Sequence, residues 1–209
     1  MQKGKFITLE GIDGAGKSTH LSWIADYLCN QGVSVVSTRE PGGTQLAEHV
    51  RSLLLDHRQM MHPETETLLM FAARREHLDK VILPSLDQGI WVISDRFTDA
   101  SYAYQGGGRG VLVDKLQILE RWVQGDFQPN LTLYFDLSIE VARLRMQSIK
   151  IADRFEKEQD NFFHRVREAY ITRAKQFPER IQILDASRSI ADITHQIEKI
   201  LQPLLGKVK

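Results

Sequence analysis

Short runs of apolar and β-branched residues alternate along this chain with longer stretches in which apolar residues recur every three or four positions. The short runs predict five strands, at residues 6–9, 33–37, 90–94, 131–135 and 181–184. The first, third and fourth runs are almost continuously apolar, which is typical of strands covered by helices on both faces. Every interval between runs is long enough for a crossover helix, so the pattern predicts a doubly wound α/β fold with a parallel sheet. We expect one domain over residues 1–209.

Composition narrows the class of protein. The 209 residues hold 27 Lys and Arg against 27 Asp and Glu, which argues against a general polyanion binder and predicts no nucleic-acid partner. No apolar stretch approaches the ~20 residues of a membrane span, and no apolar leader opens the chain. Cys29 is the single cysteine, which excludes an internal disulfide. These features predict a cytoplasmic protein with no membrane partner.

A phosphate-binding loop follows the first predicted strand. Gly11, four further residues and then Gly16, Lys17 and Ser18 match the strand–GxxxxGK[ST]–helix pattern. Glycines allow backbone N–H groups to converge on phosphate oxygens, and the following helix adds its positive end. Lys17 is expected to reach the β- and γ-phosphates, and the Ser18 hydroxyl to coordinate Mg²⁺. The predicted phosphate contacts come from Gly11, Ile12, Asp13, Gly14, Ala15, Gly16, Lys17, Ser18 and Thr19.

The loop alone is compatible with GTP switches, motor ATPases and small-molecule kinases. A Ras-type switch would carry an Asn/Thr-Lys-x-Asp segment after a later strand, and the chain has none. Assembly ATPases and helicases are usually larger, so a compact kinase is favoured. Such a kinase needs arginines for a second anionic substrate. Asp95 and Arg96 end a buried strand, where Asp95 could hold the Mg²⁺ water shell and Arg96 the acceptor phosphate.

Five segments resemble thymidylate kinases of the bacterial type, in the order and roughly the spacing of that family. They are LEGIDGAGKST at 9–19, TREPGGT at 38–44, LLMFAARREH at 68–77, ISDRFTDASYAYQGGGRG at 93–110 and DRFE at 153–156. The resemblance implies a P-loop NTPase fold with a phosphate loop at 11–18 and a lid near 143–157. It also implies transfer of the γ-phosphoryl group of ATP to dTMP for dTTP synthesis, with Mg²⁺ as cofactor and a homodimer as the assembly.

The resemblance also implies a base pocket. Phe71 would stack on thymine and Arg75 would hydrogen-bond a thymine carbonyl, because an aromatic face and a guanidinium donor suit base recognition. Ser101 and Gln105 would lie near the pyrimidine edge. Tyr104 would lie beneath the sugar, where its ring would exclude a ribose 2′-hydroxyl.

The same resemblance places Arg51 and Arg96 on the dTMP phosphate. Asp13 would contact the sugar 3′-hydroxyl or the Mg²⁺ water shell, with Glu40 close to both. No protein base is strongly required, since the attacking group is already a phosphate oxygen anion. Ala100 departs from the family, which commonly has Ser there, and the missing hydroxyl weakens the phosphate contact by about 1 kcal/mol.

The catalytic arginine is less clearly indicated. One branch of the family carries it inside the phosphate loop, where this chain has Gly14, so the lid is expected to supply it. The lid arginines are sparse here, and we expect Arg154 first, with Arg145 and Lys150 as alternatives. The predicted catalytic set is therefore Lys17, Asp13, Arg96, Arg154 and Arg145.

Two other functions stay open on the sequence alone. One is a monophosphate kinase that prefers another pyrimidine such as dUMP, and the other is a nucleotide-binding regulatory protein with negligible transfer. The seven histidines show no spacing typical of metal ligands, and each is expected to have either a solvated or a helix-face role.

Overall fold

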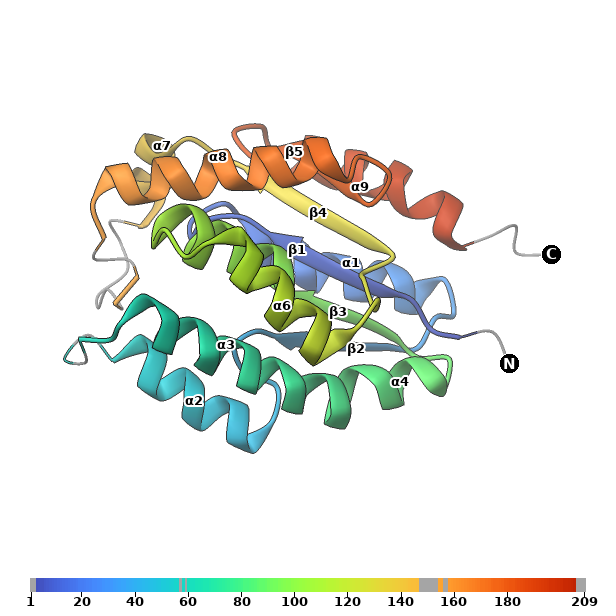
Figure 1. The fold of residues 1–209 in the computed structure, drawn as a ribbon. Coiled ribbons are helices and arrows are strands. Elements are labelled where there is room, and N and C mark those ends of the chain that lie inside the picture. Colours follow the sequence, from blue (N-terminus) through green and yellow to red (C-terminus); the bar gives the residue numbers. More distant parts are fainter. Residues whose placement is uncertain (1–2, 57, 59, 147–153, 156–157, 206–209) are drawn as a thin grey trace.

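The computed structural model of the chain describes residues 3–56, 58, 60–146, 154–155 and 158–205 (Figure 1). Over these residues five strands join in one parallel sheet, in the order β2-β3-β1-β4-β5. The predicted parallel α/β architecture is confirmed, and each strand begins within two residues of its predicted position. The elements in chain order are β1 (Phe6–Glu10), α1 (Lys17–Asn30), β2 (Val35–Arg39), α2 (Gln45–Leu55), α3 (Pro63–His77), the π-helical η1 (Leu78–Ile82), α4 (Leu83–Asp87), β3 (Trp91–Asp95), α5 (Thr98–Ser101), the π-helical η2 (Tyr102–Gly108), α6 (Val113–Gln124), β4 (Leu131–Asp136), α7 (Ile139–Met146), α8 (Asp160–Gln176), β5 (Ile181–Asp185) and α9 (Ile190–Leu205).

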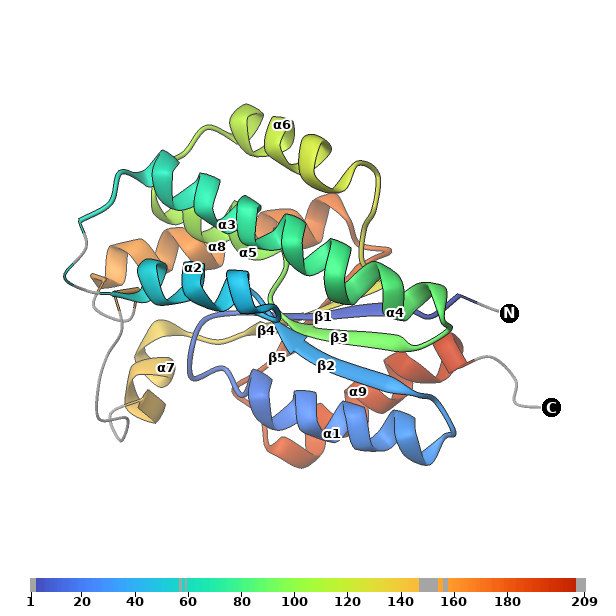
Figure 2. The same ribbon diagram turned by 90° about the horizontal axis from the view of Figure 1, so that it is seen from below.

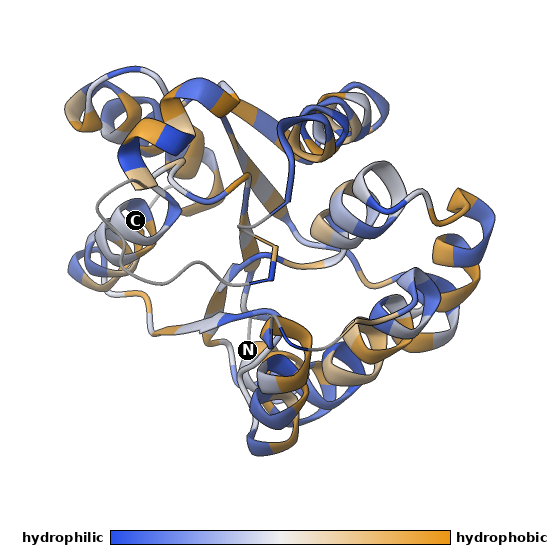
Figure 3. Ribbon diagram, turned by 90° about the vertical axis from the view of Figure 1, so that its left-hand side faces the viewer, coloured by the Kyte–Doolittle hydropathy of each residue, from blue (hydrophilic) through white to orange (hydrophobic). Residues whose placement is uncertain are grey.

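Helices cover both faces of the sheet. Figure 2 shows α1 and α9 on one face and α3, α4, α6 and α8 on the other. The central strands β1, β3 and β4 are buried along nearly their whole length, and Ile7, Ile93 and Leu133 have no exposed surface. This double burial explains why these three segments are almost continuously apolar, while the surrounding helices carry both hydrophilic and hydrophobic residues (Figure 3).

Several residues with positive φ lie in the loops that follow the carboxyl ends of the strands. The loop after β1 turns through Gly11, Gly14 and Gly16, which all have positive φ. A side chain at Gly11 would place its Cβ 2.6 Å from the Phe135 carbonyl oxygen of β4, so the close approach of the loop to the sheet requires glycine there. The phosphate loop therefore lies at the end of the sheet where such folds bind ligands.

Part of the predicted lid at 143–157 lies outside the described residues, including Lys150. The described part comprises the end of α7 and residues 154–155. None of the described helices combines the length and the apolar character that a membrane span requires.

Candidate active site

The phosphate loop holds a buried ammonium group. Lys17 is 5% exposed, and its Nζ donates to the carbonyl oxygens of Gly11, at 3.0 Å, and Ile12, at 3.1 Å. The same Nζ lies 3.7 Å from Asp13 Oδ1 and 4.0 Å from Asp95 Oδ1. Burial lowers the pKa of Lys17, and the two carboxylates oppose that shift. Lys17 also begins α1, so charge and helix dipole together favour an anion at this loop.

Arg96 follows β3 in a left-handed backbone conformation, with φ of 72°. A non-glycine residue adopts this conformation at a cost of order 1–3 kcal/mol, so the surrounding structure must hold it. Three hydrogen bonds do so: Arg96 N donates to the Leu9 carbonyl at 2.9 Å, Ser94 Oγ donates to the Arg96 carbonyl at 2.7 Å, and Phe97 N donates to Glu10 Oε1 at 2.7 Å. The ends of β1 and β3 therefore fix the direction in which the Arg96 side chain leaves the sheet.

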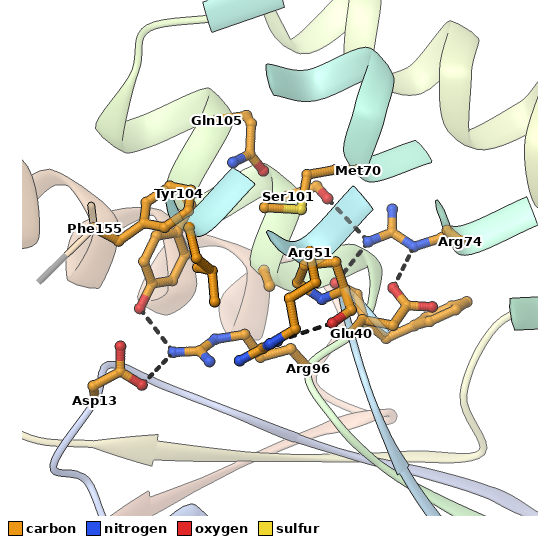
Figure 4. A pocket seen from close by; sticks show the side chains of 14 residues that line it. Asp13, Glu40, Arg51, Met70, Arg74, Arg96, Ser101, Tyr104, Gln105 and Phe155 are labelled. Carbon is orange, nitrogen blue, oxygen red and sulfur yellow. Dashed lines mark hydrogen bonds and ion pairs between the residues drawn. The ribbon is translucent and has the colours of Figure 1, made fainter. Parts of the chain in front are cut away.

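The Arg96 guanidinium reaches across to the phosphate loop (Figure 4). Its Nη2 donates to Asp13 Oδ1 at 2.7 Å and to the Tyr104 hydroxyl at 3.1 Å. Burial alone would raise the pKa of Asp13, but the charges of Arg96 and Lys17 outweigh it and hold that pKa well below its usual range. Asp13 is therefore a fixed carboxylate between a lysine on the loop side and an arginine on the far side.

Behind Arg96 lies a cavity of about 180 Å³ (Figure 4). Its wall is formed by the loops that follow β1, β2 and β3 and by four helical segments, α2, α3, α5 and η2, as expected for a site at the carboxyl edge of the sheet. It includes the predicted residues Asp13, Glu40, Arg51, Arg96, Ser101, Tyr104 and Gln105, and also Pro41, Leu55, Met70, Arg74, Phe97, Ala100 and Phe155.

Two predicted base contacts do not reach this cavity. Phe71 is 1% exposed and packs in the apolar cluster between the sheet and α6. Arg75 points to the outside of α3, where Nη1 donates to the Val123 carbonyl at 2.9 Å and Nη2 to Asp79 Oδ1 at 3.3 Å. The structure thus corrects both assignments, because each side chain leaves α3 in a direction away from the cavity.

Met70 and Arg74, each one residue earlier on α3, line the cavity instead. Arg74 is 3% exposed; its Nε donates to Glu40 Oε2 at 2.7 Å, and its Nη2 donates to Ser101 Oγ at 3.0 Å and to the Phe97 carbonyl at 3.2 Å. The third nitrogen, Nη1, is buried and has no hydrogen-bond partner within the described part of the chain. A buried unpaired guanidinium donor at a cavity wall is suited to a ligand acceptor.

A buried histidine contacts Glu40 from behind this wall. His77 has no exposed surface, and its Nδ1 lies 3.0 Å from Glu40 Oε1 while its Nε2 lies 2.7 Å from Thr38 Oγ1. Of the two roles expected for the histidines, His77 therefore has the helix-face role and not the solvated one, and so does His20, which lies on α1 and is 2% exposed. The sequence does contain an indication that His77 lies near Arg74. It follows Arg74 by three residues, and residues three apart share one face of a helix.

The two lid arginines that were predicted as catalytic residues have different partners in the structure. Arg145 is exposed, and its Nη1 lies 3.4 Å from the Gly14 carbonyl of the phosphate loop. Arg154 instead points to α3, where its Nη2 donates to Glu66 Oε2 at 2.7 Å. The first sequence choice is therefore engaged away from the loop in this structure, and the second is the one beside it.

Ser18 and Asp95 line a second groove next to the loop. The Oδ1 atom of Asp95 is buried and accepts no hydrogen bond from the described residues. Those residues contain no group of three His, Cys, Asp or Glu side chains placed to hold a metal ion by themselves. One carboxylate and one hydroxyl fit Mg²⁺, which keeps most of its ligands as water and substrate phosphate oxygens.

Known proteins resemble the chain along nearly its whole length. A family model described as thymidylate kinase matches residues 9–197. The curated thymidylate kinase of Nitrosomonas europaea is 64% identical over 202 residues, covering 97% of this chain and 94% of the relative. That of Nitrosospira multiformis is 66% identical over 197 residues, covering 94% and 96%. A crystal structure of thymidylate kinase from Ehrlichia chaffeensis superimposes with a TM-score of 0.78 at 37% identity, covering 96% of this chain and 99% of the other.

Proposed function

The chain belongs to the thymidylate kinase family and phosphorylates dTMP with ATP for dTTP synthesis, and we propose that it does so between the phosphate loop and the cavity behind Arg96. One observation carries this proposal. Lys17 on the donor side and Arg96 on the acceptor side both lie against Asp13, with Nζ 3.7 Å and Nη2 2.7 Å from the same Oδ1 atom. Because both cations lie next to the same carboxylate, the phosphate groups that they bind would lie close together, which suits direct transfer between them.

On the donor side the phosphates of ATP lie in the loop from Gly11 to Thr19, with Lys17 at the β- and γ-phosphates. Ser18 and Asp95 would hold Mg²⁺, Asp95 partly through water. The chemistry that this ion would supply is neutralisation of charge on the phosphate oxygens. Support for this arrangement comes from the buried ammonium and from the Oδ1 atom of Asp95, which is buried and accepts no hydrogen bond within the described part of the chain.

On the acceptor side Arg96 and Arg51 bind the dTMP phosphate. Arg51 lines the same cavity and donates to the Pro41 carbonyl at 2.9 Å, which orients its guanidinium along the wall. Asp13 contacts the sugar 3′-hydroxyl or the Mg²⁺ water shell, with Glu40 nearby, and the Tyr104 ring lies beneath the sugar. Ala100 also lines the cavity, and we propose that the missing hydroxyl leaves more of the phosphate contact to the arginines.

The base contacts are reassigned to the cavity-lining face of α3. Met70 packs against the face of thymine, since a flexible thioether packs well on an aromatic ring. Arg74 donates through Nη1 to a thymine carbonyl, and Ser101 and Gln105 complete the pyrimidine edge. The unpaired, buried Nη1 is the feature that favours Arg74 over Arg75.

The chemistry requires alignment and charge neutralisation more than proton transfer, because the attacking oxygen is already anionic. We propose Arg145 as the lid arginine that meets the transferring phosphoryl group, on its proximity to the loop at Gly14. Arg154 would have to leave Glu66 to take that role.

We also propose a cytoplasmic homodimer of single-domain subunits, each spanning residues 1–209. Large apolar side chains of α3 and α6 are exposed, among them Leu68 by 54%, Ile118 by 67% and Trp122 by 80%. Leu68 and Ile118 line a common apolar groove between the two helices. Exposed apolar groups gathered on one face are typical of a protein–protein interface.

The function is tested by ADP release from Mg·ATP with dTMP, dUMP, dCMP or dAMP offered singly. We expect dTMP to give the highest kcat/KM. Faster turnover with dUMP would overturn the base assignment, and no stimulation by any acceptor would favour a regulatory nucleotide-binding protein.

A further inference from the structure

Glu66 is a completely buried carboxylate on α3, just outside the cavity wall. It accepts hydrogen bonds from Gln105 Nε2 at 2.8 Å, Arg109 Nε at 3.2 Å and Arg154 Nη2 at 2.7 Å. Gln105 belongs to η2, Arg109 follows it, and Arg154 comes from the segment before α8. A buried charge is retained only where it is paired and hydrogen-bonded, and here one carboxylate joins three separate parts of the chain.

The two arginines bound to Glu66 enclose an aromatic side chain of the cavity wall. Phe155 is 6% exposed and lies with its ring centroid 4.8 Å from the Cζ of Arg154 and 5.5 Å from the Cζ of Arg109. Its ring meets the edge of Tyr104 at 5.8 Å between centroids, and both rings line the cavity. Two guanidinium groups that bind Glu66 therefore also contact the ring of Phe155.

We propose that Glu66 is a positioning residue for dTMP, which fixes Gln105 directly and Phe155 through Arg109 and Arg154. This rests on the proposed function of the cavity as the dTMP site. Glu66 touches no reacting atom; it sets the shape of the wall on the side away from the phosphate loop.

The negative charge of Glu66 is balanced by the arginines around it. Arg109 also donates through Nη1 to Glu158 Oε1 at 2.5 Å, so the cluster holds two guanidiniums and two carboxylates. The Nη2 atom of Arg109 is already buried without a hydrogen-bond partner among the described residues. Loss of the Glu66 charge leaves both arginines with Glu158 as the remaining carboxylate of the cluster, and the wall around Phe155 loosens.

The test is the KM of each substrate in Glu66→Gln, with dTMP and ATP varied separately. We expect the KM for dTMP to rise about tenfold or more, as charge-assisted hydrogen bonds are lost, while the KM for ATP changes less than about twofold. Glu64→Gln is the matched control, because Glu64 lies two residues away on the exposed side of α3 and pairs with Lys115. It should leave both KM values unchanged.

A second pair of variants separates positioning from stability. Arg109→Met alone should also raise the KM for dTMP. The double variant Glu66→Gln/Arg109→Met removes one carboxylate and one guanidinium, so the net charge of the cluster returns to that of the wild type. Its melting temperature should recover relative to Glu66→Gln, while its KM for dTMP stays raised because Gln105 and Phe155 remain unanchored.

Several outcomes would overturn the inference. A folded Glu66→Gln or Arg109→Met enzyme with the wild-type KM for dTMP would do so, and so would a double variant that regains the wild-type KM together with its melting temperature. If Glu66→Gln does not fold, Arg109→Met and the double variant decide the question. Failure of the wild type to turn over dTMP would instead overturn the proposed function, so the two failures are distinguishable.

Discussion

Replacing Arg74 by lysine tests the corrected base pocket most directly. The change keeps a positive charge beside Glu40 but removes the planar fork, so the Nη1 donor is lost together with the Nη2 contacts to Phe97 and Ser101. A hydrogen bond from a charged donor contributes roughly 1.5–3 kcal/mol, and about 1.4 kcal/mol corresponds to a factor of ten. We therefore expect the KM for dTMP to rise about 10- to 100-fold in Arg74→Lys.

The neighbouring Arg75→Lys is the matched control, since it makes the same chemical change one residue away. Arg75 has a side chain 49% exposed and contacts Val123 and Asp79 outside the cavity. Its KM for dTMP should stay within about twofold of the wild type, as surface changes usually have small effects. Both variants are measured by ADP release at saturating ATP, with the KM for ATP and the melting temperature recorded in parallel.

The reasoning would be refuted if Arg75→Lys raised the KM for dTMP as much as Arg74→Lys does. Equal increases in the KM for dTMP and for ATP in Arg74→Lys would also contradict it. Such a result would indicate a general disturbance of the cleft rather than loss of a base contact.

Three further predictions concern the loop, the core and the subunit interface. Lys17→Ala should lower kcat by roughly 100-fold or more while the melting temperature is kept, and a parallel loss of both would indicate a structural lysine. Burial raises the pKa of Glu10 to about 8, so between about pH 4.5 and pH 8 the native state keeps a proton that the unfolded chain has lost. The free energy of unfolding should fall as the pH rises through that window, and urea unfolding of Glu10→Gln should show a smaller fall; equal slopes would argue against a protonated Glu10. Ile118→Lys/Trp122→Lys should give monomers in light scattering after size exclusion, whereas Ile190→Lys on α9 should not, and an unchanged mass would place the interface elsewhere.

The sheet and the phosphate loop could be predicted because their determinants are local. An apolar run covered on both faces is visible as a run, and the segment from Gly11 to Ser18 carries its turn glycines, lysine and hydroxyl within eight positions. The second strand was predicted two residues early, since it is partly exposed and its pattern is weaker.

The face of α3 could not be predicted in the same way. Its inward residues include Glu66, Arg74 and His77, which are buried because partners distant in sequence satisfy them. An apolar stripe therefore does not mark the buried side of this helix. Neighbouring residues on a helix point about 100° apart, and Met70 and Phe71 are both apolar, so the sequence left the rotation of the helix undetermined by one position.

The left-handed backbone of Arg96 ties ligand binding to the integrity of the protein interior. Arg96 is our proposed clamp on the acceptor phosphate. Its backbone is held by hydrogen bonds that involve Leu9 and Glu10 of one strand and Ser94 of the neighbouring strand, so this arrangement exists only while the two strands are paired. A partly folded chain does not hold Arg96 in this position. A bound acceptor nucleotide therefore favours the fully folded protein over partly folded forms. By mass action, the acceptor nucleotide is thus also a stabilising ligand for the innermost part of the sheet.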